Sequence, residues 1–281
     1  MNRPTDNPEW LPLDLVGGPA SHVRISPFGA ELRALTLGGA DVLWSGADAD
    51  WPHPAALIYP VFGRAPDADV PPHGPARLAR FERLSRRASA PRLAWRNLTV
   101  QHHVTARSYQ QTIRIRNDRT APLSYSFGLH PGFYLPGFGS GGRAFLMAPE
   151  GTRFPETAER MEAMALTGRT APLDASGGVL CLAQQRDFAT GGRFLRNFAP
   201  RWLWLLNPAT GQRIRLGFRG FRHMALWSRP GLDGLCIEPL TAGPGTGAAA
   251  GQAKLQPGRA AVFGFSVTLE AGGTPDAGAT A

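Results

Sequence analysis

Two titratable side chains each precede a proline near the end of an apolar stretch: His130 before Pro131, and Glu238 before Pro239. Each proline restricts the preceding residue to extended backbone, so both side chains have little conformational freedom. Histidine titrates near neutral pH, and a glutamate in apolar surroundings can be tuned towards that range. The two residue types are therefore suited to general acid–base chemistry. Taken alone, His130 is also typical of a hydrogen-bonded structural histidine, and Glu238 of a carboxylate paired with an arginine.

A second group of polar residues follows the apolar segment at residues 59–64. Arg64 ends that segment, and His73 lies in the loop-like stretch rich in Pro and Asp that comes next. An arginine and a histidine fixed near the end of a strand can donate hydrogen bonds to a polar ligand. Taken singly, each is also typical of a surface or bridging residue.

The segments that carry His130 and Glu238 alternate with a period of two. Along residues 123–133 the apolar side chains fall on one face, while small or polar groups and His130 fall on the other. In residues 235–240, Leu235 and Ile237 point one way and Glu238 the other. This alternation predicts β-strands whose apolar faces form core and whose other faces present the titratable groups.

Short alternating segments and turn signals recur along most of the chain, with almost no helical periodicity. The clearest strand covers residues 261–269, and only residues 155–166 suggest a short helix. This pattern predicts an all-β fold, a large antiparallel sandwich. We expect a loose arm at residues 1–21, a single β-sandwich domain at 22–270 and a disordered tail at 271–281.

The formal net charge is +9, and Lys254 is the only lysine among the 30 basic residues. Such a balance raises the hypothesis of nucleic-acid binding. The arginines are scattered, however, and no basic run resembles a nucleic-acid reading element, so we predict no nucleic-acid partner. The densest cluster is interpreted as a solvated face, with a phosphate site or a patch for acidic partners as alternatives; it comprises Arg77, Arg80, Arg83, Arg86 and Arg87.

The sequence shows no motif for a metal, a cofactor or a membrane. Cys181 and Cys236 do not form a CxxC pair, and no HExxH or GxSxG motif occurs. No apolar run approaches the roughly 18 residues of a membrane span, and the N-terminal residues lack the apolar core of a signal peptide. Two isolated cysteines fit a reducing compartment. We therefore predict a cytoplasmic protein without metal or cofactor, and leave its oligomeric state open.

Six fragments occur in an order that resembles the aldose 1-epimerase, or galactose mutarotase-like, family, in particular its bacterial branch. The resemblance covers roughly residues 22–269. The fragments are FGAEL at 28–32, VLW at 42–44, PVFGR at 60–64, P-x-HG-x-AR at 71–77, SFGLHPGF at 126–133 and LCIEP at 235–239. Two positions depart from the pattern, because Pro75 and Leu240 stand where Phe and Trp are usual.

The resemblance implies an antiparallel β-supersandwich that binds a hexose in a cleft. It places the general acid on His130 and the general base on Glu238, and it places sugar contacts on His73 and Arg64. Asp187 is the candidate counterpart of the acidic residue that holds sugar hydroxyls in many members. These roles are what the resemblance implies for this chain.

Aldose 1-epimerase chemistry interconverts the α and β anomers of a sugar. The ring oxygen gains a proton, the C1 hydroxyl loses one, the ring opens, and it closes on the other face of C1; one acid and one base suffice. A hexose-phosphate mutarotase is the first alternative, with Arg77 or Arg80 on the phosphate. The second is a carbohydrate-binding protein that kept the fold without catalysis, which the presence of both His130 and Glu238 disfavours.

Overall fold

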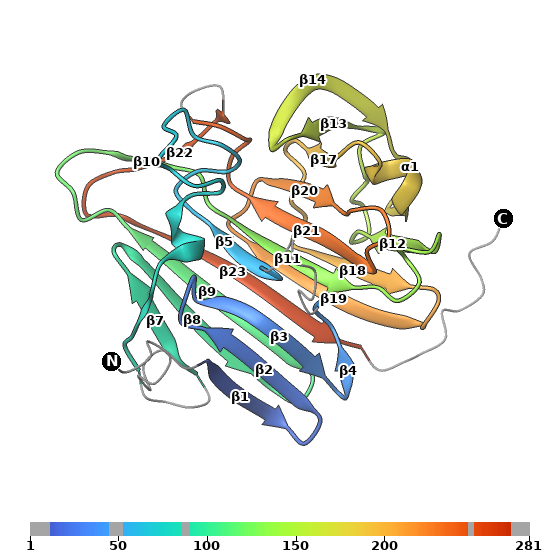
Figure 1. Ribbon diagram of the computed structural model, residues 1–281, viewed down its shortest axis with the longest axis horizontal. Helices are drawn as coiled ribbons and strands as arrows, with labels where there is room; N and C mark the ends of the chain where they lie inside the picture. The colour runs from blue at the N-terminus through green and yellow to red at the C-terminus, as the bar shows by residue number, and fades with distance from the viewer. Residues whose placement is uncertain (1–11, 45–52, 86–89, 247–249, 271–281) are drawn as a thin grey trace, which may run out of the picture.

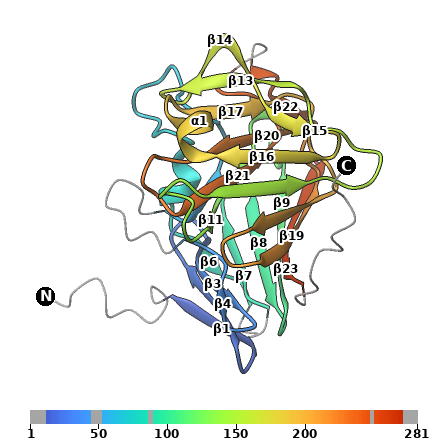
Figure 2. The same cartoon turned by 90° about the vertical axis from the view of Figure 1, so that its right-hand side faces the viewer.

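The computed structural model describes residues 12–44, 53–85, 90–246 and 250–270. In these residues β-strands predominate, arranged as two layers, with one layer lying in front of the other in Figure 1 and the same layers seen from the side in Figure 2. The all-β antiparallel prediction is confirmed. Alternating side chains explain the layers, because each sheet buries its apolar face against the other.

The back layer is a ten-stranded antiparallel sheet that runs the length of the molecule (Figure 1). Its longest strands, β9 and β23, pair over nine residues from Ala260–Arg116 to Thr268–Ser108. In spatial order its strands are β15 (Asp174–Ser176), β16 (Val179–Ala183), β12 (Arg143–Met147), β18 (Trp202–Asn207), β19 (Gln212–Arg219), β23 (Ala260–Leu269), β9 (Ser108–Arg116), β8 (Leu98–Val104), β7 (Arg92–Trp95) and β6 (Glu82–Arg83).

The front layer consists of a four-stranded and a seven-stranded sheet. The four-stranded sheet lies over β7, β8 and β9 (Figure 1), in the order β1 (Leu13–Gly18), β2 (Ser21–Ser26), β3 (Glu31–Leu37) and β4 (Ala40–Asp41). The seven-stranded sheet has the order β14 (Ala165–Pro172), β13 (Thr157–Glu162), β17 (Gly192–Leu195), β20 (His223–Trp227), β21 (Gly234–Leu240), β11 (Gly128–Tyr134) and β5 (Ala55–Ile58).

Four further small elements belong to the described part of the chain. They are the strand pair β10 (Leu123–Tyr125) and β22 (Ala253–Leu255), the helix α1 (Gln184–Phe188) and the 3₁₀ turn η3 (Pro75–Leu78). No helix among the described residues is long and apolar enough to span a bilayer.

The main hydrophobic core lies between the two layers. Leu129, Leu235 and Ile237 of the front layer belong to the same buried cluster as Phe263 and Phe265 of the back layer. The opposite face of the seven-stranded sheet carries a second, smaller buried cluster that includes Phe62, Met161 and Leu240. Because side chains alternate along a strand, the residues between the core positions of β11 and β21 face this second side.

Three sequence predictions need correction. Residues 13–18 are not a loose arm: they form β1, whose inward Leu15 is buried against the core, and they pair with β2. Residues 155–166 are not helical but enter β13 and β14, because tertiary pairing with β17 overrides helix propensity. The strand at residues 123–133 is interrupted at Ser126 and Phe127 and divides into β10 and β11. Residues 1–11 and 271–281 lie outside the described part.

Candidate active site

His130 and Glu238 lie opposite each other on the neighbouring strands β11 and β21. The register pairs Gly128 with Leu240 and Gly132 with Cys236, so the midpoint of this segment sets His130 across from Glu238. The Nε2 atom of His130 is 3.2 Å from Oε1 of Glu238. The predicted alternation is confirmed, since the neighbours Leu129 and Ile237 face the core.

Burial decides the protonation of this pair. The exposed fractions of the His130 and Glu238 residues are 5% and 2%. Burial disfavours the charged form of each group: it raises the pKa of Glu238 from 4.5 to about 8 and lowers the pKa of His130 well below its ordinary value of 6.5. The proximity of His73 and Arg77 lowers the pKa of His130 further. At neutral pH the proton they share therefore rests on the carboxyl group.

One oxygen of Glu238 is left for a ligand. Its Oε2 atom is buried and accepts no hydrogen bond within the described part of the chain. A buried polar atom without a partner costs free energy unless a ligand or water satisfies it. Oε2 therefore marks the place where a polar group of a ligand would sit.

His73 stands beside the pair and is held rigidly. Its backbone adopts the left-handed conformation (φ 64°), which is uncommon for a residue other than glycine. Its ring stacks on Phe62, with centroids 5.5 Å apart, and meets the ring of His130 edge-on at 5.7 Å. Burial, and then the Arg77 charge, lower the pKa of His73 to about 4, so the imidazole is neutral near pH 7.

A cavity of about 380 Å³ opens over these three residues. This volume lies in the range of small-molecule sites. One wall comes from the β13–β14 hairpin and the segment before β17 and is apolar. The lining residues are Phe62, His73, His130, Met161, Ala163, Met164, Gly191, Gly192, Trp227, Arg229 and Glu238.

Of the lining residues that were not predicted from the sequence, Trp227 and Arg229 are the two that carry a side-chain hydrogen-bond donor. Trp227 ends β20 and pairs with Cys236 of β21, which places it on the face of the sheet that carries Glu238. The rings of Trp227 and His130 meet edge-on with centroids 6.2 Å apart. Arg229 follows Trp227 by two residues. Because side chains alternate along a strand, this spacing could have indicated that Arg229 lies on the same side of the sheet as Trp227.

Three of the predicted sugar contacts do not line the cavity. Arg64 is exposed to solvent, because Gly63 turns the chain with a φ of 77°. Arg77 is half-buried and its Nε donates a hydrogen bond to the carbonyl of Pro72 at 2.9 Å. Arg80, the other predicted phosphate contact, is exposed and pairs through its backbone with Phe28. Only His73 among the predicted binding residues stands in the cavity with His130 and Glu238.

Asp187 does not line this cavity either. It lies on helix α1, accepts a hydrogen bond from the Ala183 amide at 2.8 Å and pairs with Arg186 at 2.9 Å. It lines a separate hollow with Asp174, Arg186 and Arg193. Its carboxylate is therefore committed to the local structure of α1, and Asp187 is not among the residues that line the cavity over His130.

The polar groups of the cavity suit proton transfer and recognition of hydroxyl groups. His130 and Glu238 can pass one proton between two positions of a ligand, while His73 and Arg229 offer hydrogen-bond donors. Among the described residues, no three His, Cys, Asp or Glu side chains are grouped so that they could hold a metal ion.

Comparison with solved structures shows that the chain has a known fold. A galactose mutarotase-like protein from Lactobacillus casei matches 92% of this chain and 100% of its own, with a TM-score of 0.78 and 19% identity. The chain has the galactose mutarotase-like fold. A galactose mutarotase related enzyme from Lactobacillus acidophilus shares this fold over 93% and 98% of the two chains, with a TM-score of 0.77 and 18% identity.

The galactose mutarotase-like fold also relates the chain to a eukaryotic protein. An aldose epimerase homologue from C. elegans matches 92% of this chain and 98% of its own, with a TM-score of 0.68 and 12% identity. No protein-family model matches the sequence. No curated protein matches it significantly. The similarity is therefore one of fold across the whole chain.

Proposed function

We propose that this protein is an aldose 1-epimerase that interconverts the α and β anomers of a hexose. The observation that carries the proposal is the buried His130–Glu238 pair, 3.2 Å apart, at the floor of a cavity large enough for one sugar. The galactose mutarotase-like fold supports it.

The closeness of the two groups matches the chemistry. The ring oxygen and the C1 hydroxyl oxygen are bonded to the same carbon, so the acid and the base that serve them must both reach the surroundings of C1, as two neighbouring side chains can. In the opening step one group protonates the ring oxygen while the other removes the C1 hydroxyl proton, and the C1–ring-oxygen bond breaks to give the open-chain aldehyde. Rotation about the C1–C2 bond and closure with the roles reversed give the other anomer.

The His130–Glu238 pair can act with either residue as the acid and the other as the base. A protonated Glu238 with neutral His130 contains the same number of protons as ionised Glu238 with protonated His130. Each form supplies one acid and one base, and the roles that the sequence resemblance implied, His130 as acid and Glu238 as base, correspond to the second form. Burial of the two groups favours the first form. A bound sugar that hydrogen-bonds Oε2 would favour the ionised carboxylate.

The remaining cavity residues would bind and orient the sugar. The neutral imidazole of His73 and the guanidinium of Arg229 can each donate hydrogen bonds to hydroxyl groups. Trp227 offers an aromatic surface beside His130. Holding C1 against the pair lowers the entropy cost of reaching the transition state. Two free, buried cysteines, Cys181 and Cys236, support a cytoplasmic location.

A hexose-phosphate mutarotase is the second candidate, and the position of Arg229 favours it. Arg229 supplies a guanidinium to the cavity, and among the residues that line this cavity the only carboxylate is Glu238. Arginine is well suited to binding phosphate. This candidate uses the same acid–base pair and differs only in substrate.

Polarimetry on freshly dissolved single anomers tests the proposal. The panel would hold neutral hexoses, pentoses and hexose 6-phosphates, each followed with and without protein. Acceleration of mutarotation for at least one sugar is the expected result. If saturable binding to a sugar were measured by calorimetry but no sugar were turned over, the carbohydrate-binding alternative would replace the enzyme.

A further inference from the structure

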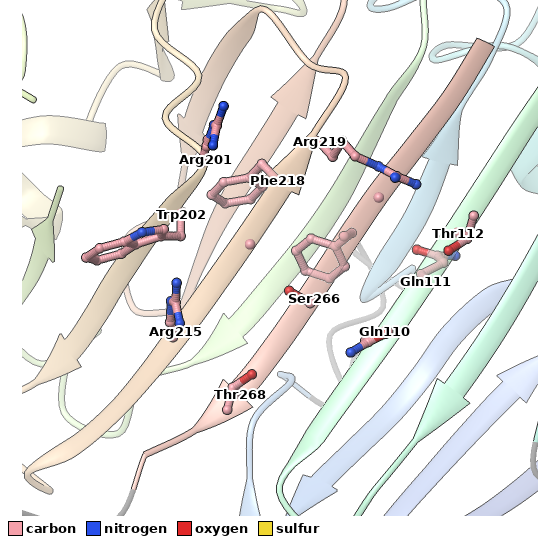
Figure 3. A pocket seen from close by; sticks show the side chains of 13 residues that line it. Gln110, Gln111, Thr112, Arg201, Trp202, Arg215, Phe218, Arg219, Ser266 and Thr268 are labelled. Atoms are coloured by element: carbon pink, nitrogen blue, oxygen red, sulfur yellow. The ribbon is translucent and has the colours of Figure 1, made fainter. Parts of the chain in front are cut away.

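A second hollow lies on the ten-stranded sheet, on the face turned away from the core. It has a volume of about 670 Å³ and is formed by β18, β19, β23 and β9 (Figure 3). It shares no lining residue with the cavity over His130. We call it the outer furrow. Its outward-facing polar side chains are Gln110, Thr112, Arg201, Trp202, Arg215, Arg219, Ser266 and Thr268.

The furrow lies where two glycines, Gly217 and Gly264, occupy neighbouring rows of the sheet. Trp202, Gly217, Ser266 and Gln110 form one row across the four strands, and Gly264 lies between Arg219 and Thr112 in the row beside it. A Cβ atom on Gly217 would lie 2.4 Å from the Ser266 hydroxyl, so this position takes no side chain without displacing Ser266. Because these two glycines have no side chain, the outer furrow lies open between Trp202 on one side and Gln110 on the other (Figure 3).

The outer furrow is strongly basic. None of the strands β8, β9, β18, β19 and β23 contains an aspartate or glutamate. Arg201, Arg215 and Arg219 line it and are exposed, and within the described residues no acidic side chain pairs with them. Unpaired guanidinium groups around a hollow attract anions and can bind carboxylates in bidentate geometry.

Aromatic contacts fix part of this charge. The guanidinium of Arg215 lies 4.8 Å from the centre of the Trp202 ring, and that of Arg213 lies 4.0 Å from the centre of the Trp204 ring. The two rings meet edge-on at 5.7 Å. Cation–π contacts of this kind reduce the conformational freedom of an arginine. Of the three lining arginines, Arg215 is therefore partly ordered before a ligand arrives.

We propose that the outer furrow binds an acidic oligosaccharide, a short chain of sugars that carry carboxylates. The three arginines would take the carboxylates, while Gln110, Thr112, Ser266 and Thr268 offer the neutral donors and acceptors that sugar hydroxyls need. Trp202 provides one amphipathic surface for a sugar ring. Three inter-strand steps separate β18 from β9, about 14 Å, which accommodates a few sugar rings.

The lining favours this ligand over single-stranded nucleic acid. Nucleic-acid platforms stack successive bases on several aromatic side chains. Here Trp202 is the one aromatic residue of the lining that is not buried, because Phe218 and Phe265 point into the core. A neutral oligosaccharide would leave the arginines unused.

Calorimetry at physiological salt tests the proposal, with tetragalacturonate as the probe. Neutral tetragalactose, an oligothymidylate and tetraglutamate serve as comparison ligands. We expect tetragalacturonate alone to bind tightly, and the double variant Arg215→Ala/Arg219→Ala to weaken it at least about tenfold. Arg169→Ala, an exposed arginine of β14 outside the furrow, is the matched control and should change nothing. Sugar turnover in the cavity should be unchanged by the double variant.

Four outcomes would overturn the inference. They are no binding of tetragalacturonate, equal weakening by Arg169→Ala, equal binding of tetraglutamate, and tighter binding of the oligothymidylate. Equal binding of tetraglutamate would show that the furrow binds anions without selecting sugars. Tighter binding of the oligothymidylate would show that it is a nucleic-acid site. Each is separable from a failure of the proposed epimerase activity, since the calorimetric readout does not depend on turnover.

Discussion

Gly63 and His73 are joined by two hydrogen bonds. The amide of Gly63 donates to Nδ1 of His73 at 3.3 Å, and the amide of His73 donates to the carbonyl of Gly63 at 2.7 Å. Because Nδ1 accepts, the neutral imidazole must carry its proton on Nε2. The backbone therefore selects the tautomer that presents a donor.

This relationship predicts a binding role for His73 without a role in proton transfer. In His73→Asn the left-handed backbone is retained, since asparagine tolerates it, but the Nε2 donor is lost. We expect KM for the sugar to rise about tenfold, the value of one lost hydrogen bond of about 1 kcal/mol or slightly more, with kcat little changed. Steady-state polarimetry measures both constants. A loss confined to kcat would instead place His73 in the chemistry.

The buried carboxyl group of Glu238 should make stability depend on pH. Folded protein keeps the Glu238 proton up to its pKa of about 8, whereas unfolded chain loses it near 4.5. Unfolded protein thus binds fewer protons over this range, and the free energy of unfolding falls as pH rises. Below 6.5, histidines of lowered pKa such as His130 act in the opposite sense, so pH 6.5–8 isolates the glutamate.

Glu238→Gln should remove this fall. We expect the wild type to lose stability relative to the variant between pH 6.5 and 8, by at most about 1.4 kcal/mol per pH unit for one proton. Denaturant titrations at four pH values measure the difference. Glu150→Gln makes the same chemical change at an exposed position and is the control. Parallel curves for wild type and Glu238→Gln would show that Glu238 ionises at an ordinary pH.

The turn that closes one wall of the cavity holds an unfavourable backbone. Ala163 and Met164, between the paired Glu162 and Ala165, have φ values of 48° and 67°. Asparagine followed by glycine is the preferred pair for such a hairpin turn. Ala163→Asn/Met164→Gly should therefore raise the free energy of unfolding by about 1 kcal/mol. Gly168→Ala, at a φ of 73° with open space around its Cβ, should lower it. Calorimetric unfolding measures the stability of both variants. If Ala163→Asn/Met164→Gly were no more stable than the wild type, the backbone of this turn would not be strained.

Arg229 should distinguish a phosphorylated from a neutral substrate. Replacement by Gln removes the guanidinium from the cavity, so KM for a hexose phosphate should rise about tenfold or more, and KM for the neutral sugar much less. Arg77→Gln is the control, because Arg77 lies outside the cavity lining and should affect both sugars equally. Equal effects of Arg229→Gln on the two substrates would favour the neutral hexose.

The fold class and the strand faces that carry His130 and Glu238 could be predicted from the sequence, because both depend on local alternation. Alternation alone indicates that the side chains of His130 and Glu238 lie on the faces of their strands that point away from the core. The pairing of β11 with β21 is long-range, and the order of the family-like fragments, rather than any periodicity, brought the two residues into one site.

The remaining lining depends on contacts that local patterns do not encode. Arg64 is turned away by the conformation of Gly63, and Asp187 is held by the Ala183 amide and Arg186. Trp227 and Met161 reach the cavity only through the pairing of β20 and β13 with their neighbours. Such pairings are set by the packing of the whole sheet.

The most direct test of the account is the initial rate of mutarotation by Glu238→Gln on the best sugar of the panel. Gln keeps the size of Glu but cannot exchange a proton, so kcat should fall by about 10²–10⁴, with KM within a few-fold of wild type. Glu31→Gln is the matched control, since Glu31 is equally buried but pairs with Arg33 and His53 outside the cavity. It should retain wild-type kcat. A folded Glu238→Gln that turned over sugar at the wild-type rate would contradict the assignment of the His130–Glu238 pair as the proton-transfer site.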